Sequence, residues 1–192
     1  FQVFRFSISQ VKKMLLNILF VIALTFPVAV ASTAFTIEGK KDWSRNLMSA
    51  LILSLGQGVM YTLGDLLGST FMHLMGSLSK WLVFALCFSI GFRMLLDTMK
   101  IRNGGNLYFI QNTKHLFLLS IALGVNSFIA GLMTEFYEPF QNITPYVLIG
   151  TAFIWSVVAM AIPFSKMKLT LNSFLNLIFA AFIAAKGLLG LV

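Results

Sequence analysis

Long apolar blocks separated by short polar segments dominate this chain. Within the blocks the apolar residues are nearly continuous and do not form the stripe, recurring every three or four positions, of a helix half exposed to water. Each block has about the 20 residues that an α-helix needs to cross a hydrocarbon layer ~30 Å thick. The pattern predicts six membrane-spanning helices, at about residues 14–36, 47–74, 79–99, 115–136, 145–164 and 169–191.

The amino-acid composition agrees with this pattern. Of the 192 residues, 58% are hydrophobic and 10% are charged. In a soluble globular domain roughly a quarter of the residues are charged, because its surface faces water. We therefore predict an all-α integral membrane protein in which residues 1–192 form a single transmembrane domain and the lipid bilayer is the main partner.

The net charge of +8 raises the question of a nucleic-acid partner. Lys and Arg, however, stand in no run longer than two and gather at the ends of the apolar blocks, a placement typical of residues that orient a membrane protein. The loops after the first, third and fifth spans carry eight of them against four on the other side, which predicts that these loops are cytoplasmic. We expect no nucleic-acid partner. The chain has no phosphate-binding loop, nucleophile elbow or metal-hydrolase motif that would indicate an enzyme.

Two segments of the first half recur, in order, in the second half. The matching pairs are residues 22–31 with 121–130 and residues 90–95 with 183–188. Each member of the second pair carries one cation, Arg93 or Lys186. The sequence therefore predicts two repeats, about residues 14–99 and 115–191, joined near the turn at residues 103–106. Repeats of three spans insert with opposite orientations. Transporters built from inverted repeats of this kind bind their cargo near mid-membrane, where the halves meet.

The first span also has features of a signal peptide. Lys12 and Lys13 precede an apolar run, and Ala29-Val30-Ala31 resembles a cleavage site. Its counterpart in the second half favours a membrane span instead.

Polar side chains are most frequent in the second span. A set spaced every four residues forms a ridge along one side of this helix and comprises Gln57, Tyr61, Asp65, Ser69 and His73. Five glycines accompany the ridge and allow another helix to approach closely. Because ionisable groups in membrane helices are costly and mark functional sites, we predict that Asp65 lies within reach of an ion. The alternative is a structural hydrogen bond or ion pair with Arg93 or Lys186.

Asn126 lies inside the fourth span, and its counterpart in the first span is Pro27. Proline deprives a backbone carbonyl of its donor, and asparagine offers one acceptor and two donors. Such a symmetric pair near mid-membrane suits an ion path, and a hydrogen bond between helices is the alternative role of Asn126. Arg93 and Asp97, four residues apart near the end of the third span, are expected to form an interfacial pair.

The candidate ion path therefore comprises Asp65, Gln57, Asn126 and Pro27, with Tyr61, Ser69, Arg93, Asp97 and Lys186 in supporting positions. Asp65 and Asn126 are the candidate metal ligands, because their side chains offer oxygen atoms to a divalent cation.

Two motifs connect the chain with a known family. Residues 56–68 read Gly-Gln-Gly-Val-Met-Tyr-Thr-Leu-Gly-Asp-Leu-Leu-Gly, and residues 90–97 read Ile-Gly-Phe-Arg-Met-Leu-Leu-Asp. They resemble patterns of the bacterial manganese efflux pump (MntP-type) family of LysE-like exporters: Phe-Gln, Met and Gly-x-Leu-Leu-Gly in the second span, and Ile-Gly-x-Lys-Met-Ile-x-Glu in the third. The resemblance runs from about residue 14 to the end. It implies a multi-pass protein of the bacterial inner membrane with no permanently bound cofactor and a transported divalent cation such as manganese.

The chain departs from this family at two positions. The family carries a Ser-x-Asp-Ala signature in the first and fourth spans, to whose aspartates the resemblance assigns the cation. Their counterparts here look like Pro27 and Asn126, so both carboxylates are missing, and Asp65 is the candidate replacement. Two hypotheses follow. The chain is a divergent cation exporter with its ion path between the repeats, or it is a non-transporting subunit or scaffold in a complex with other membrane proteins.

Overall fold

The computed structural model describes the backbone of residues 2–33, 43–75, 79–102, 113–136, 143–162 and 166–189. Side chains are described in these ranges except at residues 2–13, 71–75, 100–102, 113, 166, 168–169 and 189. The regular structure within them is helical: α1 (Gln2–Ser32), α2 (Trp43–Met75), α3 (Ser79–Arg102), α4 (Thr113–Leu132), α6 (Pro145–Ala161) and α7 (Lys166–Leu189). The prediction of an all-α protein with six helices is confirmed. The expected turn at residues 103–106 and the side chain of His73 lie outside the described part.

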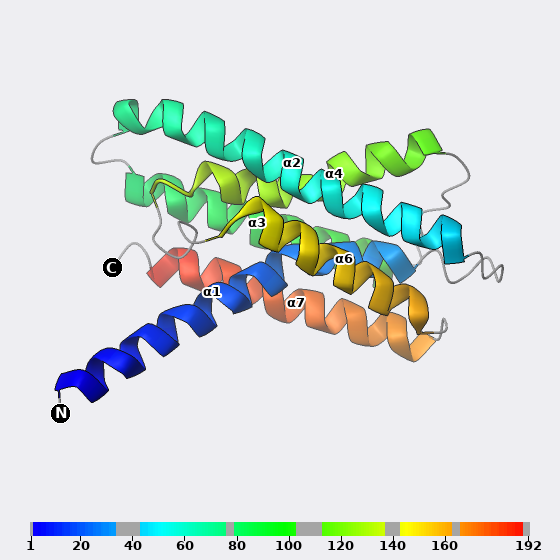
Figure 1. Cartoon of the computed structure of the whole chain (residues 1–192), viewed down its shortest axis with the longest axis horizontal. Helices are drawn as coiled ribbons and strands as arrows, with labels where there is room; N and C mark the ends of the chain where they lie inside the picture. The colour runs from blue at the N-terminus through cyan, green and yellow to red at the C-terminus, as the bar shows by residue number, and fades with distance from the viewer. Residues whose placement is uncertain are drawn as a thin grey trace.

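Five of these helices are long and apolar enough to cross a membrane. The exception is α6, whose 17 residues extend ~26 Å at a rise of about 1.5 Å per residue. It begins at Pro145, which suits the first turn of a helix, where a backbone N–H would have no helical acceptor. α1 continues past Pro27 to Ser32, and its N-terminal part projects beyond the other helices (Figure 1). Pro27 therefore does not interrupt the helix.

The helices pack mainly across the two halves of the chain. α2 packs against α4 and α6, α3 against α7, and α1 against α6 and α7, whereas α1 and α2 touch only slightly (Figure 1). Exchanging the first three helices with the last three turns the α2–α4 pair into the α1–α6 pair, and both pairs are present. This is the arrangement expected of interlocked repeats, although the repeat itself stays a prediction.

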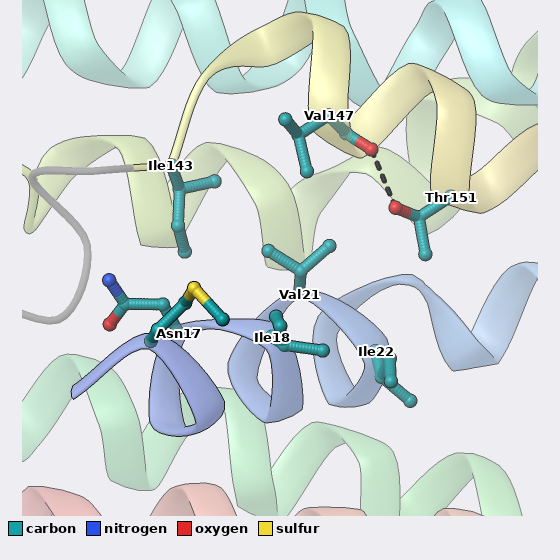
Figure 2. A pocket seen from close by; sticks show the side chains of 8 residues that line it. Asn17, Ile18, Val21, Ile22, Ile143, Val147 and Thr151 are labelled. Carbon is teal, nitrogen blue, oxygen red and sulfur yellow. Dashed lines mark hydrogen bonds between the residues drawn. The ribbon is translucent and has the colours of Figure 1, made fainter. Parts of the chain in front are cut away.

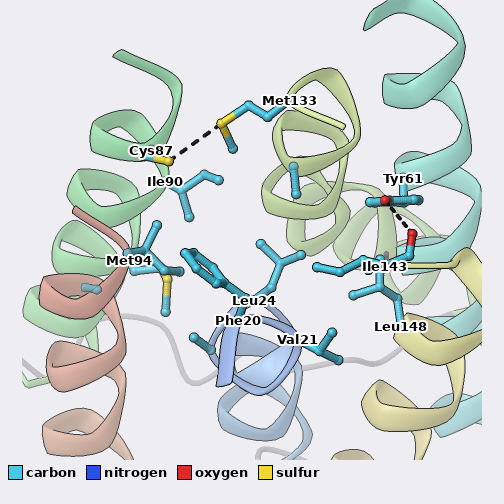
Figure 3. Packing of buried hydrophobic residues seen from close by; sticks show 14 of the residues in the cluster. Phe20, Val21, Leu24, Tyr61, Cys87, Ile90, Met94, Met133, Ile143 and Leu148 are labelled. Carbon is cyan, nitrogen blue, oxygen red and sulfur yellow. Dashed lines mark hydrogen bonds between the residues drawn. The ribbon is translucent and has the colours of Figure 1, made fainter. Parts of the chain in front are cut away.

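Apolar side chains from all six helices meet in the largest buried cluster. Figure 3 shows Phe20 and Leu24 of α1 at its centre, facing Ile90 and Met94 of α3. The ring of Phe20 also lies 5.2 Å from that of Phe182 in α7. Because lipid and protein interior are equally apolar, close packing of such side chains holds the helices together more than any hydrophobic effect between them.

Glycines bring the backbones of α2 and α4 into close contact. Gly56 lies against Ser120 and Gly68 against Leu132, so the two helices run in the same direction. At Gly64 an added Cβ atom would lie 2.1 Å from the carbonyl oxygen of Phe128. We call the contact between α2 and α4, from Ile52 and Ser120 to Gly68 and Leu132, the α2–α4 seam. A side chain at Gly64 or Gly68 would meet backbone atoms of α4 and would separate the helices.

Candidate functional site

Gln57 lies midway along the α2–α4 seam and is completely buried. The hydroxyl of Ser127 in α4 donates a hydrogen bond of 2.6 Å to its Oε1 atom. Its Nε2 atom has no hydrogen-bond partner among the residues that the structure describes. A buried donor without an acceptor costs about 1–3 kcal/mol. Gln57 is thus a buried polar residue whose unsatisfied donor lowers the stability of the fold.

Asn126, one residue before Ser127, is 2% exposed and faces α3. Its Oδ1 atom accepts a hydrogen bond of 3.3 Å from Nη1 of Arg93. Nη2 of the same guanidinium donates to the backbone carbonyl of Ala122, one turn earlier in α4. Arg93 therefore forms its hydrogen bonds with α4. The sequence had suggested a different partner, Asp97 on the same helix as Arg93.

Asp65 lies near one end of the seam and is half-buried. The backbone at Asp65 lies against Gly131, one residue before the end of α4. In the part of the chain that the structure describes, the carboxylate forms no hydrogen bond and no ion pair, and neither Arg93 nor Lys186 neutralises it. The alternative of a structural ion pair with one of these cations thus finds no support here.

Tyr61 connects the end of the seam with its centre. It is buried, and its hydroxyl donates a hydrogen bond of 2.7 Å to the carbonyl of Ile143 at the start of α6 (Figure 3). Thr134 lies 3.5 Å from the same hydroxyl. Asp65, Tyr61 and Gln57 therefore follow one another along α2 from half-buried to fully buried, over ~12 Å at about 1.5 Å per residue.

The remaining predicted residues lie apart from this line. Ser69 is exposed and donates to the carbonyl of Leu66 in its own helix. Asp97 and Lys186 are half-buried on α3 and α7, and each has an interaction partner. Pro27 is on α1, where it offers no side-chain ligand. The structure thus places Gln57 in the seam against Ser127 and Asn126 on the side of α4 that faces α3, with Asp65 two turns from Gln57 along α2.

A third buried amide, Asn176 of α7, was not predicted from the sequence. Its Nδ2 atom donates 3.0 Å to the carbonyl of Met94 and 2.9 Å to the hydroxyl of Thr98, both in α3. Its Oδ1 atom has no partner among the described residues. The available signal was an asparagine flanked by leucines inside an apolar block.

Two further features of the structure bear on where a metal ion could bind. Among the described residues, no group of three or more His, Cys, Asp or Glu side chains could hold an ion. A groove of about 440 Å³ opens between α1 and α6, but its lining is mainly apolar, as Ile18, Val21 and Val147 illustrate (Figure 2). None of the candidate path residues lines this groove. Any ion site on the seam would therefore use isolated oxygens rather than a preformed carboxylate cage.

The unsatisfied Nε2 donor of Gln57 leads to a testable prediction about stability. We expect Gln57→Leu to leave the free energy of unfolding within about 1 kcal/mol of wild type, because it removes an unsatisfied donor and Ser127 can turn its hydroxyl to a carbonyl of its own helix. Tyr61→Phe removes a satisfied buried bond and should cost about 1 kcal/mol. Thermal unfolding in one detergent measures both. A loss of more than ~2 kcal/mol in Gln57→Leu would mean that Nε2 has a partner, such as bound water.

Known proteins match this chain over most of its length. A family described as "Putative manganese efflux pump" matches residues 40–189. The putative manganese efflux pump MntP of Bacteroides thetaiotaomicron is 26% identical over 139 residues, which cover 70% of this chain and 71% of that protein. The protein of the same name from Crocosphaera subtropica is 28% identical over 119 residues, 62% of each chain. That from Rippkaea orientalis is 30% identical over 101 residues, 53% of this chain and 54% of its own length.

The chain thus spans between about half and about seven tenths of the length of these relatives. No solved structure matches it. The family match begins within the segment before α2 and continues to the end of α7, so it includes the whole α2–α4 seam and the arginine on α3. It confirms the resemblance expected from the motifs of the second and third spans: the chain belongs to the manganese efflux pump (MntP) family.

Proposed function

We propose that this protein exports a divalent cation, manganese in the first place, across the bacterial inner membrane. Its family and the names of its relatives support this activity. The proposed route follows the boundary between two inverted three-helix repeats, from Asp65 at the end of the seam to Gln57 and Asn126 at its centre.

The packing of α1 on α6 supports the proposed repeats. Under the predicted alignment, Val28 and Ala29 of α1 correspond to Ser127 and Phe128 of α4. Val28 shares a buried cluster with Ala152 of α6, and Ala29 shares another with Ala159. Ala152 and Ala159 are seven residues apart, the same spacing as Gln57 and Gly64, which contact Ser127 and Phe128 on the other side. A two-fold relation between the halves would produce this shared spacing, which supports the proposed repeats.

The half-buried carboxylate of Asp65 is the observation that carries the proposal. A carboxylate within a membrane helix is expensive, and this one forms no ion pair with a described residue. Carboxylate and carbonyl oxygens suit manganese. In this role Asp65 attracts the cation at the end of the seam. The amide oxygens of Gln57 and Asn126 then replace part of its water shell further in.

One observation favours the second candidate, a non-transporting subunit of a membrane complex. The centre of the seam offers neutral amides and the guanidinium of Arg93, with no carboxylate from either residue that aligns with the family signature. A divalent cation is held less well by neutral oxygens than by charged ones. Under this hypothesis the polar line along α2 only joins helices.

Flux through the purified wild-type chain separates the two candidates. We expect proteoliposomes loaded with a manganese-sensitive dye to accumulate Mn²⁺ at least tenfold faster than protein-free vesicles, whereas Mg²⁺, which sheds its water reluctantly, should enter slowly. Manganese flux equal to that of empty vesicles, together with stoichiometric partner proteins after mild-detergent purification, would support the subunit and reject the exporter.

A further inference from the structure

Arg93 occupies the oxygens that a cation at the centre of the seam would need. The oxygen at Asn126 is the amide acceptor that sequence analysis assigned to the ion, and the carbonyl of Ala122 lies one turn away on the same helix. Both accept a hydrogen bond from the one guanidinium. Because guanidinium has donors and no acceptor, Arg93 cannot itself bind a metal ion. Its positive charge repels any cation that approaches these two oxygens.

The position of Arg93 also allows it to leave. Its side chain is half-buried, whereas Asn126 is 2% exposed, so the charged group approaches α4 from a partly open side. An arginine side chain is long and can carry its charge several ångströms while its backbone stays in place. The backbone of α3 is anchored at this point: Gly91 lies against Ala180 and Ala184 of α7, and Met94 is completely buried. Movement here therefore belongs to the side chain and not to the helix.

We infer that Arg93 is a tethered cation that occupies the Asn126 and Ala122 oxygens in the empty carrier and must withdraw before the transported cation binds there. The inference rests on the proposed function and adds a specificity-determining residue to it. In the empty protein the guanidinium gives the amide oxygen of Asn126 a donor and adds a second donor to the carbonyl of Ala122, which lies inside α4 and accepts a helical hydrogen bond. A transported ion must bind these two oxygens more tightly than the guanidinium of Arg93 does. This competition sets a lower limit on the affinity of any cation that the protein transports.

The test replaces the charge of Arg93 and measures Mn²⁺ alone. Arg93→Gln keeps a hydrogen-bond donor but removes the competing charge. We expect its half-saturating Mn²⁺ concentration, measured by flux and by thermal stabilisation in detergent, to fall at least tenfold below wild type. Arg93→Lys keeps the charge but loses the planar fork that holds two oxygens together, so its half-saturating concentration should lie between the other two.

The outcomes separate this inference from the proposed function. An unchanged half-saturating concentration in folded Arg93→Gln, with wild-type Mn²⁺ flux present, overturns the tethered cation and leaves the exporter intact. Absence of both flux and Mn²⁺-dependent stabilisation in all three proteins rejects the exporter. Should Arg93→Gln fail to fold, Arg93→Lys decides, since a merely structural arginine would give wild-type affinity with lysine in its place or lose stability without any gain in affinity.

Discussion

Gly64→Leu is expected to destabilise the protein strongly. An added Cβ atom at this position would lie 2.1 Å from the carbonyl oxygen and 2.9 Å from the carbonyl carbon of Phe128. These are backbone atoms of α4, so no side-chain rotation can relieve the clash, and the two helices would have to separate along the seam. Overpacking of a well-packed interior typically costs 1–3 kcal/mol, and we expect about 3 kcal/mol or more here.

Gly150→Leu is the matched control for this prediction. Gly150 is exposed on α6, and an added Cβ atom there meets nothing within 4 Å. The same replacement should therefore leave the yield of monodisperse protein and its melting temperature in detergent unchanged. Size-exclusion chromatography and thermal unfolding measure both variants. Equal stability of Gly64→Leu and wild type would show that α2 and α4 are not in contact in the membrane.

The six helices could be predicted from the sequence because their cause is local. An apolar block must form a helix in lipid, since only a helix satisfies its backbone within the segment. The ends are less determined: α1 begins at Gln2, far before the expected start near residue 14, because polar residues such as Gln10 and Lys12 can continue a helix outside the hydrocarbon layer. Conversely, the apolar run to residue 164 does not continue α6 beyond Ala161.

The candidate site was predicted only in part, because the sequence reveals which helix face a residue shares but not what lies opposite. The ridge of Gln57 and Tyr61 could be predicted, and both are buried against other helices. Their partners, Ser127 and the carbonyl of Ile143, depend on the register between helices far apart in the chain. Arg93 illustrates the same limit. Its spacing from Asp97 suggested a pair within α3, but the close approach of α4 offers two oxygens instead.

Pro27 illustrates how packing can support a residue that lacks a helical hydrogen bond. It lies inside α1, which continues past it to Ser32. Thr25 donates a hydrogen bond of 2.8 Å to the carbonyl of Val21, and the segment around it is buried among neighbouring helices. Packing from all sides keeps such a segment helical although one backbone hydrogen bond is missing.

Asp65→Asn is expected to decrease manganese export strongly while the protein stays folded. The substitution preserves the shape of the side chain and removes the charge that attracts a divalent cation to the end of the seam. Loss of a charged ligand on the order of 1.5–3 kcal/mol corresponds to a decrease in flux of about 10- to 100-fold. Stability should be unchanged or greater, because the half-buried carboxylate forms no ion pair with a described residue and is costly in a membrane helix.

Glu135→Gln makes the same chemical change at an exposed carboxylate just beyond α4. If bulk negative charge on this side of the protein were sufficient, the two variants would lose Mn²⁺ flux equally; a ligand role for Asp65 requires that only its variant does. Vesicle flux and melting temperature, measured together, distinguish loss of binding from loss of fold. Wild-type flux in folded Asp65→Asn would remove this carboxylate from the path and leave the cation to the amide oxygens of Gln57 and Asn126, which would then have to outcompete Arg93 unaided.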